Sequence, residues 1–286
     1  MTTRRQHYVW RHYLRPWAKN DQIWCQRAGK QFHGNLMNIG QERDFYAPRL
    51  VTREEVDYIV ESSKHRHRGD LNSVNQEFIS FYKAVTDIKS QADCTTEVTA
   101  ALIEFEENIM GIIEQQGMEY LPMLQQGDSS FFQSDEHRAG FSHFLMIQFV
   151  RTKRMRDTIF SSMRKILAQR GLDIENVWAV DKYVTARHLA LSIFANKEYT
   201  ISFMRNATAT DLITCDQPVF NIHAVDQPGK IPVEVELYYP ITPSLAIMLS
   251  KKSHEKNLAE NEVMVLNSWV RKMSHEQIYS ASQNFL

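Results

Sequence analysis

The sequence predicts an α+β fold in which a β-rich N-terminal segment and a C-terminal antiparallel sheet pack against a central layer of helices. Residues 6–46 combine short β-prone runs with turn residues, and residues 52–196 place apolar side chains three and four positions apart. Residues 199–250 return to β-prone runs, and the short connections between those runs favour antiparallel pairing, because parallel strands need long crossovers. The change of periodicity therefore divides the chain into strand, helix and strand regions.

The chain is long enough for ordinary globular packing. Its 286 residues can bury a substantial apolar core, and hydrophobic residues at 43% with charged residues at 23% are typical of globular proteins. We expect one domain over residues 1–286, divided into β-rich 1–50, helical 52–196, mainly β 199–250, and a terminal helix and strand within 260–281. With 33 Lys and Arg against 34 Asp and Glu, a nucleic-acid partner would need a local basic patch.

The three cysteines indicate neither a disulfide framework nor a structural zinc site. Cys25, Cys94 and Cys215 lie far apart and form no C-x-x-C pair. The N-terminus carries charge where a signal peptide has its apolar stretch, and no later run approaches the roughly 18 apolar residues of a membrane span. We therefore expect a cytoplasmic protein without a membrane partner.

The N-terminal segment is expected to consist of short strands joined by turns. Residues 23–25 are β-prone, and Gly29 and Gly34 indicate turns. Thr52 and Glu55 then have the spacing of a capping box, in which each side chain accepts a hydrogen bond from a backbone N–H at the start of a helix. A helix should follow and end near Gly69.

The helical region is expected to contain four further stretches. Apolar side chains recur at helical spacing over residues 74–85, over 98–112 before Gly117, over a long run from Asp135 to Gly171, and around 184–194. The second of these stretches is therefore expected to end before Gly117.

The C-terminal region is expected to form four strands followed by a helix and a last strand. Pro228 and Gly229 indicate a turn between the second and third strands. The expected strands cover residues 199–204, 211–215, 233–239 and 245–249, the helix covers 260–273, and the last strand covers 277–280.

Short motifs at the N-terminus resemble a known bacterial family. Gln6-His7-Tyr8-Val9, Tyr13-Leu14-Arg15 and Trp17 are similar to the Gln-His-Tyr-Val-Pro and Tyr-Leu-Arg-x-aromatic opening of the family called domain of unknown function 4238 (DUF4238). Trp10 stands where that family usually has proline. Residues 23–30 and 42–46 also match its next segments.

The C-terminal part continues the resemblance in the same order. Thr214-Cys215-Asp216-Gln217-Pro218-Val219 is similar to the family's Thr-Ser-Asp-Asn-Pro-Val, and Tyr239 to Pro243 is similar to its Phe-Pro-Leu-Ser-Pro. Asn267 and residues 278–280 match its closing helix and strand. The resemblance implies one continuous domain and supplies positions to inspect, but it implies no particular reaction.

Asp216 is the first candidate for chemistry. It follows an apolar run and precedes Pro218 by two residues, which places a carboxylate at a strand end, where metal ligands and general bases are common. A divalent metal is the cofactor that this reading implies. The alternative is an Asx-turn, in which the aspartate side chain binds its own downstream backbone.

His7 and Arg15 are the next candidates. An imidazole that titrates near neutrality can act as general acid or base, although a lone histidine in a strand is also commonly a hydrogen-bonded structural residue. The guanidinium of Arg15 can bind phosphate or carboxylate, and an internal ion pair is an equal alternative. These residues can meet Asp216 only if the N-terminal strands join the C-terminal sheet.

Two pairs of glutamates have spacings that metal sites use. Glu104 and Glu107 share one helical face, for which a solvated acidic surface is the competing reading. Glu234 and Glu236 would share one face of a strand. Together with Asp216 the second pair resembles a metal-nuclease site, but Tyr238 stands where such a site has lysine.

Three basic segments could contact phosphates, since charge supplies most nonspecific nucleic-acid affinity. They are Arg4-Arg5, His65 to Arg68, and Arg151 to Arg156, and solvated helix faces are the alternative reading. The chain contains no P-loop, dinucleotide-binding, H-E-x-x-H or G-x-S-x-G pattern.

The sequence leads to two hypotheses for function. In the first, the protein is an intracellular effector or hydrolase acting on nucleic acid or another phosphate-containing substrate, with His7 as acid or base and Asp216 as metal ligand or base. Gln6, Arg15 and Asn267 would bind the substrate or an anion. The family's patchy bacterial occurrence, rather than any residue, suggests a setting in phage defence or a mobile element. A protein partner or an operon neighbour is a further expectation that no residue specifies.

In the second hypothesis the protein is a noncatalytic binding or sensor module. The same five polar residues would form a buried hydrogen-bond network that holds the N-terminal segment against the sheet, because such networks can specify a fold without touching a ligand. Exposure of His7 and Asp216 distinguishes the two hypotheses.

Overall fold

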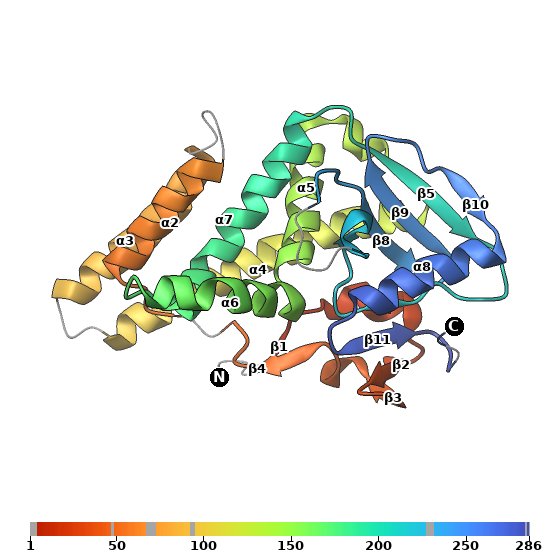
Figure 1. The fold of residues 1–286 in the computed structure, drawn as a ribbon, viewed down its shortest axis with the longest axis horizontal. Helices are drawn as coiled ribbons and strands as arrows, with labels where there is room; N and C mark the ends of the chain where they lie inside the picture. The colour runs from red at the N-terminus through yellow and green to blue at the C-terminus, as the bar shows by residue number, and fades with distance from the viewer. Residues whose placement is uncertain are drawn as a thin grey trace.

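The computed structural model describes residues 5–46, 49–66, 73–91, 95–226, 232–283 and 285. It confirms the α+β class: helices α2 to α7 largely occupy one half of the molecule, and the two larger sheets with α8 occupy the other (Figure 1). None of the helices within the described ranges is long and apolar enough to cross a membrane.

The N-terminal segment forms short strands, as predicted. A tight turn at Ala28 and Gly29, both with positive φ, joins a β-hairpin, whereas Gly34 lies inside its second strand instead of at a turn. The sequence did not predict the short helical turn that follows Trp10. The elements are β1 (Arg5–His7), α1 (Arg11–Leu14), η1 (Arg15–Trp17), β2 (Gln22–Arg27), β3 (Lys30–Asn35), η2 (Leu36–Asn38) and β4 (Gln41–Arg43).

The predicted capping box starts α2 (Arg53–Arg66). The backbone N–H of Thr52 donates to the Glu55 carboxylate at 2.8 Å, and the N–H of Glu55 donates to the Thr52 hydroxyl at 3.2 Å. Two N–H groups that lack helical partners are thereby satisfied. The predicted end near Gly69 lies outside the described residues.

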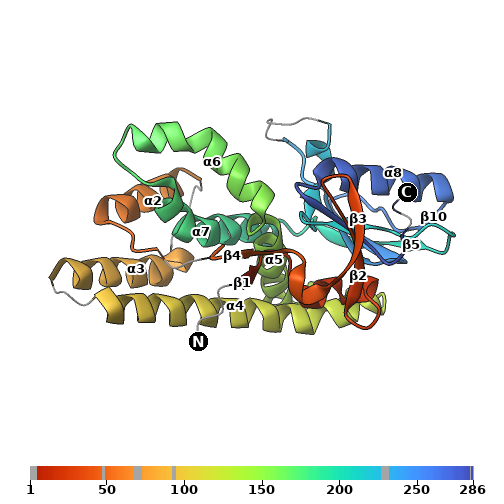
Figure 2. The ribbon, with the colours of Figure 1, turned by 90° about the horizontal axis from the view of Figure 1, so that it is seen from below.

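The helical layer continues with five longer helices. They are α3 (Ser73–Gln91), α4 (Thr95–Gln125), α5 (Asp135–Val150), α6 (Lys153–Ala168) and α7 (Ile174–Ala195). The last begins ten residues before the predicted start, because Asp173 caps it by accepting a hydrogen bond from the N–H of Glu175 at 2.8 Å. Figure 2 shows α4 running along much of the molecule's length.

The predicted helix end at Gly117 is wrong, because α4 continues through it to Gln125. The glycine is required by packing: a Cβ there would lie 2.4 Å from the Trp10 ring and 2.7 Å from the Phe144 ring. The long helical stretch expected from Asp135 to Gly171 consists of two helices, α5 and α6. It divides at Thr152, whose hydroxyl accepts a hydrogen bond from the N–H of Met155 and starts α6.

Most of the C-terminal strands form a five-stranded sheet in the order β10-β5-β9-β8-β7. Its pairs are antiparallel except β10 with β5, which are parallel. The strands are β5 (Thr200–Asn206), β7 (Phe220–Asn221), β8 (Leu237–Thr242), β9 (Leu245–Ser250) and β10 (Lys256–Leu258). The strand predicted over 233–239 thus starts later, so Glu234 and Glu236 precede the sheet instead of lying within it. The predicted turn at Pro228 and Gly229 lies outside the described residues.

A second sheet joins the two ends of the chain. Its order is β3-β2-β11-β6, where β6 is Thr214–Cys215 and β11 is Gln277–Ser280. The strand predicted over 211–215 therefore shrinks to two residues and belongs to this sheet. β11 and the preceding α8 (Glu260–Met273) have the predicted bounds. The N-terminal strands β2 and β3 do join C-terminal strands, as convergence of the candidate residues required.

Two clusters of buried side chains hold the layers together. The larger contains Tyr8 and Trp17 from the N-terminal segment, Phe144 from α5, and Tyr239 and Ile247 from the five-stranded sheet. The smaller lies between α8 and the sheets and includes Val263, Leu266, Cys215 and Met248. Core side chains thus connect all three sequence regions.

Candidate anion-binding groove

Asp216 lies in the interior and is fully buried. Its Oδ1 accepts a hydrogen bond from the backbone N–H of His275 at 2.8 Å, and its Oδ2 accepts from the N–H groups of Glu276 at 2.7 Å and Gln277 at 3.0 Å. Burial raises the pKa of the carboxyl above its usual value, and the three N–H donors partly offset that rise. The carboxylate therefore fixes the turn between α8 and β11.

The residues around Asp216 extend this buried network to the N-terminal segment. The amide of Gln277 donates to the Tyr8 hydroxyl at 2.9 Å, and its carbonyl accepts from the N–H of Gly40 at 3.4 Å. Gln217 donates to the carbonyls of Phe149 and Val219 at 3.0 and 2.7 Å. Gln217 and Gln277 thus connect the residues around Asp216 to α5 and to the N-terminal segment, which is the kind of network that the second hypothesis describes.

Asn267 and Gln6 also bind backbone groups. The side-chain carbonyl of Asn267 accepts from the N–H of Ile213 at 3.1 Å, and its amide donates to the carbonyl of Asp211 at 2.9 Å. Gln6 accepts a hydrogen bond from the N–H of Tyr46. Both side chains hold neighbouring segments in place, and the structure brings neither to His7 or Arg15.

His7 and Arg15 line one groove of about 900 Å³ on the surface. Strand β1 supplies His7, the short helical turn after it supplies Arg11 and Arg15, and α4 forms the opposite wall. The full lining comprises Arg5, His7, Trp10, Arg11, His12, Arg15, Met37, Asn38, Glu114, Gln115 and Met118. The groove therefore contains three arginines and two histidines against one carboxylate.

The three arginines of the groove carry charge that no acid neutralises within the described part of the chain. Arg5 contacts the Asn38 carbonyl at 3.5 Å and Arg15 contacts His12 Nδ1 at 3.4 Å, but no carboxylate there forms an ion pair with Arg5, Arg11 or Arg15. Arg11 and Arg15 are four residues apart in a helical turn, so their side chains lie on neighbouring positions of one face. This arrangement is suited to an anionic ligand.

His7 forms part of the groove wall in its neutral form. Its Nε2 lies 3.2 Å from the carbonyl oxygen of Leu36, and its own carbonyl accepts a hydrogen bond from Arg151 Nη2 at 2.7 Å. Burial lowers the pKa of His7, the hydrogen bond to Leu36 offsets part of the change, and nearby Arg11 and Arg151 lower it further. The lowered pKa favours the neutral form of the imidazole at pH 7.

The basic run from Arg151 to Arg156 differs from the groove because its charges are used inside the protein. Lys153 pairs with Glu42 at 2.9 Å and with Glu276 at 2.6 Å, and Arg156 pairs with Glu42 at 3.2 Å. Arg154 donates to carbonyls at the end of α8, at 3.0 Å for Met273. The other basic segments lie partly outside the described residues: Arg4, and the side chains of residues 65–68.

A second cavity of about 410 Å³ lies between α6, α7 and the segment after β4. Two of its three arginines form ion pairs, Arg49 with Glu175 and Arg156 with Glu42 and Asp157, and the third, Arg164, lies over the Phe160 ring. Because these ion pairs cancel most of its charge, this cavity is less suited to a phosphate than the groove.

Sequence reasoning singled out His7, Arg15 and Arg5 of the groove, the last as part of a basic segment, but did not predict Arg11 or the residues from α4. The four-residue spacing of Arg11 and Arg15 indicates a shared face only if this segment is helical. Residues 6–46 were expected to form strands and turns, so the spacing gave no such indication. Gln115 and Met118 lie beyond the apolar repeat of residues 98–112 on which the helix prediction rested. Glu104 and Glu107 lie exposed on α4 and are not part of the groove.

Comparison with known proteins gives a family and no nearer relative. No curated protein and no solved structure matches the chain. The family described as "Protein of unknown function (DUF4238)" matches residues 5–284. That match spans both sheets, the helical layer and the groove, and confirms the resemblance seen in the N- and C-terminal motifs. The chain belongs to the DUF4238 family.

Proposed function

We propose that the protein binds nucleic acid through the phosphate backbone in the groove formed by β1, α1, η1 and α4. The observation that carries the proposal is the set of three arginines, Arg5, Arg11 and Arg15, which line one groove without an acidic partner among the described residues. A groove that concentrates unpaired guanidinium groups in a protein of net charge −1 provides the local patch that such a ligand requires.

The groove offers two kinds of contact to such a ligand. Guanidinium groups bind phosphate oxygens through two parallel hydrogen bonds, which lysine cannot supply. Met37 and Met118 are 52% and 50% exposed and give the groove an apolar margin on which a base or sugar can rest. Contacts of these types recognise a phosphate backbone without reading its sequence.

Nucleic-acid binding should depend on the two neighbouring arginines of the helical turn, Arg11 and Arg15. In Arg11→Gln/Arg15→Gln the Kd for a fluorescent single-stranded DNA or RNA should rise about 10- to 100-fold, because two phosphate contacts are lost. The slope of log Kd against log salt should fall by about 1.4, since each contact to a single strand contributes roughly 0.7. Fluorescence anisotropy between 50 and 200 mM salt measures both.

The matched control is Lys165→Gln/Arg170→Gln, which removes the same charge from exposed residues near the end of α6 outside the groove. It should leave Kd and the salt slope within about twofold of the original protein. Equal weakening by the two double variants, or no binding by the unmodified protein at 50 mM salt, would exclude the proposed groove function.

Hydrolysis of the bound nucleic acid is a second candidate, favoured by the neutral imidazole of His7 in the groove wall. A neutral imidazole can accept a proton from an attacking hydroxyl or water. Denaturing gels of the same mixtures report cleavage. Cleavage that His7→Gln abolishes while binding is retained would support this role, and intact nucleic acid with tight binding would leave a noncatalytic binding module.

A further inference from the structure

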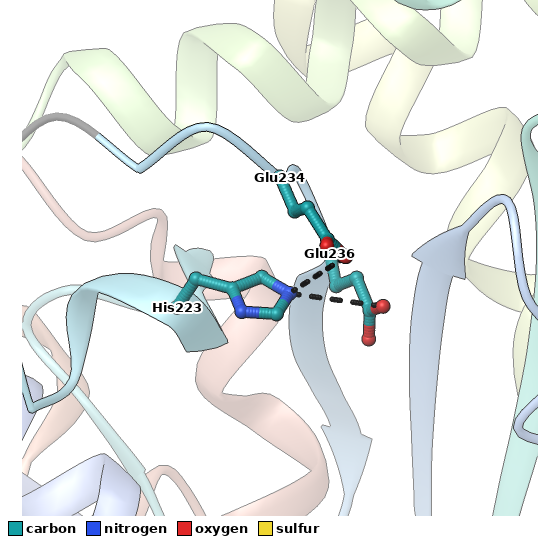
Figure 3. A group of neighbouring side chains, drawn as sticks. All are labelled: His223, Glu234 and Glu236. Atoms are coloured by element: carbon teal, nitrogen blue, oxygen red, sulfur yellow. Dashed lines mark ion pairs between the residues drawn. The ribbon is translucent and has the colours of Figure 1, made fainter.

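We infer that His223, Glu234 and Glu236 form a binding site for a divalent transition metal of the zinc type, with His254 as a fourth ligand. The three side chains come from η5 (Ile222–Ala224) and the segment before β8, and converge on one point (Figure 3). One ligand atom from each lies within 4.8 Å of the other two. This site lies apart from the groove and does not depend on the proposed function.

The sheet register explains why these residues meet. Asn221 at the end of β7 pairs with Leu237 at the start of β8, and Leu237 pairs with Leu249 near the end of β9. The chain therefore leaves β7, enters β8 and leaves β9 at the same end of the sheet. His223 follows the first of these points, the two glutamates precede the second, and His254 follows the third.

Asn221 fixes the backbone that carries the ligands. Its side-chain amide donates to the carbonyl of Glu234 at 2.8 Å, and its side-chain carbonyl accepts from the N–H groups of Glu236 and His223, both at 3.2 Å. The N–H of His254 donates to the Ser202 hydroxyl at 3.0 Å. Supports of this kind hold ligand-bearing segments in place before a metal arrives.

The distances are close to those of a bound ion. His223 Nε2 lies 3.9 Å from Glu234 Oε2 and 3.7 Å from Glu236 Oε1, and His254 Nε2 lies 3.0 Å from Glu236 Oε2. Zinc bonds of about 2.0–2.1 Å in a tetrahedral site place ligand atoms roughly 3.4 Å apart. These three separations lie within about 0.5 Å of that spacing.

Unsatisfied nitrogen atoms give independent support. The Nε2 atoms of His223 and His254 are shielded from solvent and have no hydrogen-bond partner, although both lie beside carboxylate oxygens. The Glu236 side chain beside them is buried, and only 5% of the residue's surface is exposed. A metal cation between these side chains would accept the lone pairs of both Nε2 atoms and would also neutralise the buried carboxylate of Glu236.

The ammonium group of Lys252 lies beside both glutamates and would compete with a metal ion for them. Its Nζ lies 3.1 Å from Glu234 and 3.6 Å from Glu236, and its side chain is 66% exposed. An exposed lysine can turn into solvent at little cost when a divalent ion replaces it. Imidazole and carboxylate ligands together suit zinc and neighbouring transition metals better than calcium or magnesium, which prefer oxygen ligands alone.

Isothermal titration of the EDTA-treated full chain with Zn²⁺ tests the site. One ion should bind per chain, His223→Gln and Glu234→Gln should each raise its Kd by about 100-fold or more, and Lys252→Gln should lower its Kd several-fold. The side chains of His223 and Glu234 are 35% and 60% exposed, so neither substitution should disrupt the core. Circular dichroism confirms folding of each variant.

His137→Gln is the matched control, because His137 forms a single pair with Glu119 at 3.0 Å on the surface. Its zinc Kd should equal that of the unmodified protein. The inference fails if no zinc ion binds with a Kd below about 100 µM, or if His223→Gln and His137→Gln have equal effects on that Kd. It also fails if Lys252→Gln weakens zinc binding, because Lys252 would then support the glutamates instead of competing with the metal.

Discussion

Replacing Asp216 with alanine is expected to lower the free energy of unfolding by about 3–5 kcal/mol, because it removes the buried acceptor of three backbone N–H groups. The donors are the backbone groups of His275, Glu276 and Gln277, at 2.7–3.0 Å from the carboxylate. An unsatisfied buried donor costs about 1–3 kcal/mol, and relaxation of the turn recovers part of the sum. Urea unfolding monitored by tryptophan fluorescence measures the change.

Two variants place this result in context. Asp216→Asn keeps the shape and one acceptor oxygen, so it should cost less than Asp216→Ala. Asp226→Ala removes a carboxylate that is 73% exposed and pairs with Lys272, and should cost less than about 1 kcal/mol. A change below 1 kcal/mol for Asp216→Ala would show that the three hydrogen bonds do not hold the turn before β11.

The same experiment bears on any activity assigned to Asp216. Its carboxylate is fully buried and does not line the groove of His7 and Arg15. Loss of nucleic-acid binding in Asp216→Ala would therefore follow from unfolding. We expect Asp216→Asn, wherever it remains folded, to bind nucleic acid with an unchanged Kd.

Elements with complete local signals could be predicted from the sequence. The bounds predicted for α8 and β11 are confirmed, because an acidic first turn, a basic last turn and regular apolar spacing identify α8 without reference to other segments. The capping box of Thr52 and Glu55 forms for the same reason, since both partners lie within one turn.

Elements that depend on distant partners could not be predicted. Gly117 looks like a helix end, but it is explained by the rings of Trp10 and Phe144, which pack where its side chain would be. Asp216 shows the same difficulty at the candidate site. A carboxylate that begins a turn, one that binds a metal, and one that binds N–H groups about 60 residues away have the same local sequence.

Three neighbouring glutamates of α4, Glu104, Glu106 and Glu107, give a further example. Glu104 and Glu107 are exposed, as the solvated-face interpretation predicted, while Glu106 between them is 8% exposed. Its Oε1 accepts a hydrogen bond from Tyr82 at 3.1 Å, and its Oε2 accepts one from Tyr183. Lys182 Nζ lies 3.7 Å from Oε1. Helical spacing alone does not reveal which face of α4 meets α3 and α7.

Replacing Glu106 with glutamine is expected to destabilise the protein by about 3–5 kcal/mol, because it leaves the ammonium of Lys182 buried without an anion. Lys182 is 4% exposed, and burial lowers its pKa while Glu106 opposes that change. The nearby rings of Tyr183 and Tyr46, at 4.6 and 5.2 Å from Nζ, cannot replace a full negative charge. Urea unfolding at pH 7 gives the size of the effect.

The double variant Glu106→Gln/Lys182→Met separates the cost of an unpaired charge from the value of the pair. It should recover most of the lost stability, since burying an ion pair costs each partner its hydration and an apolar side chain avoids that cost.

The stability of the Glu106→Gln variant should also depend on pH, with a sign that follows from the pKa of Lys182. A lysine whose folded pKa is lowered binds fewer protons in the native state than in the unfolded chain, so stability rises with pH until the unfolded lysine also loses its proton near pH 10.4. Glu106→Gln should therefore recover stability between pH 7 and 10, whereas the double variant should not. If both variants respond to pH alike, Lys182 is not the group that makes Glu106 necessary, and the hydrogen bonds from Tyr82 and Tyr183 account for the loss.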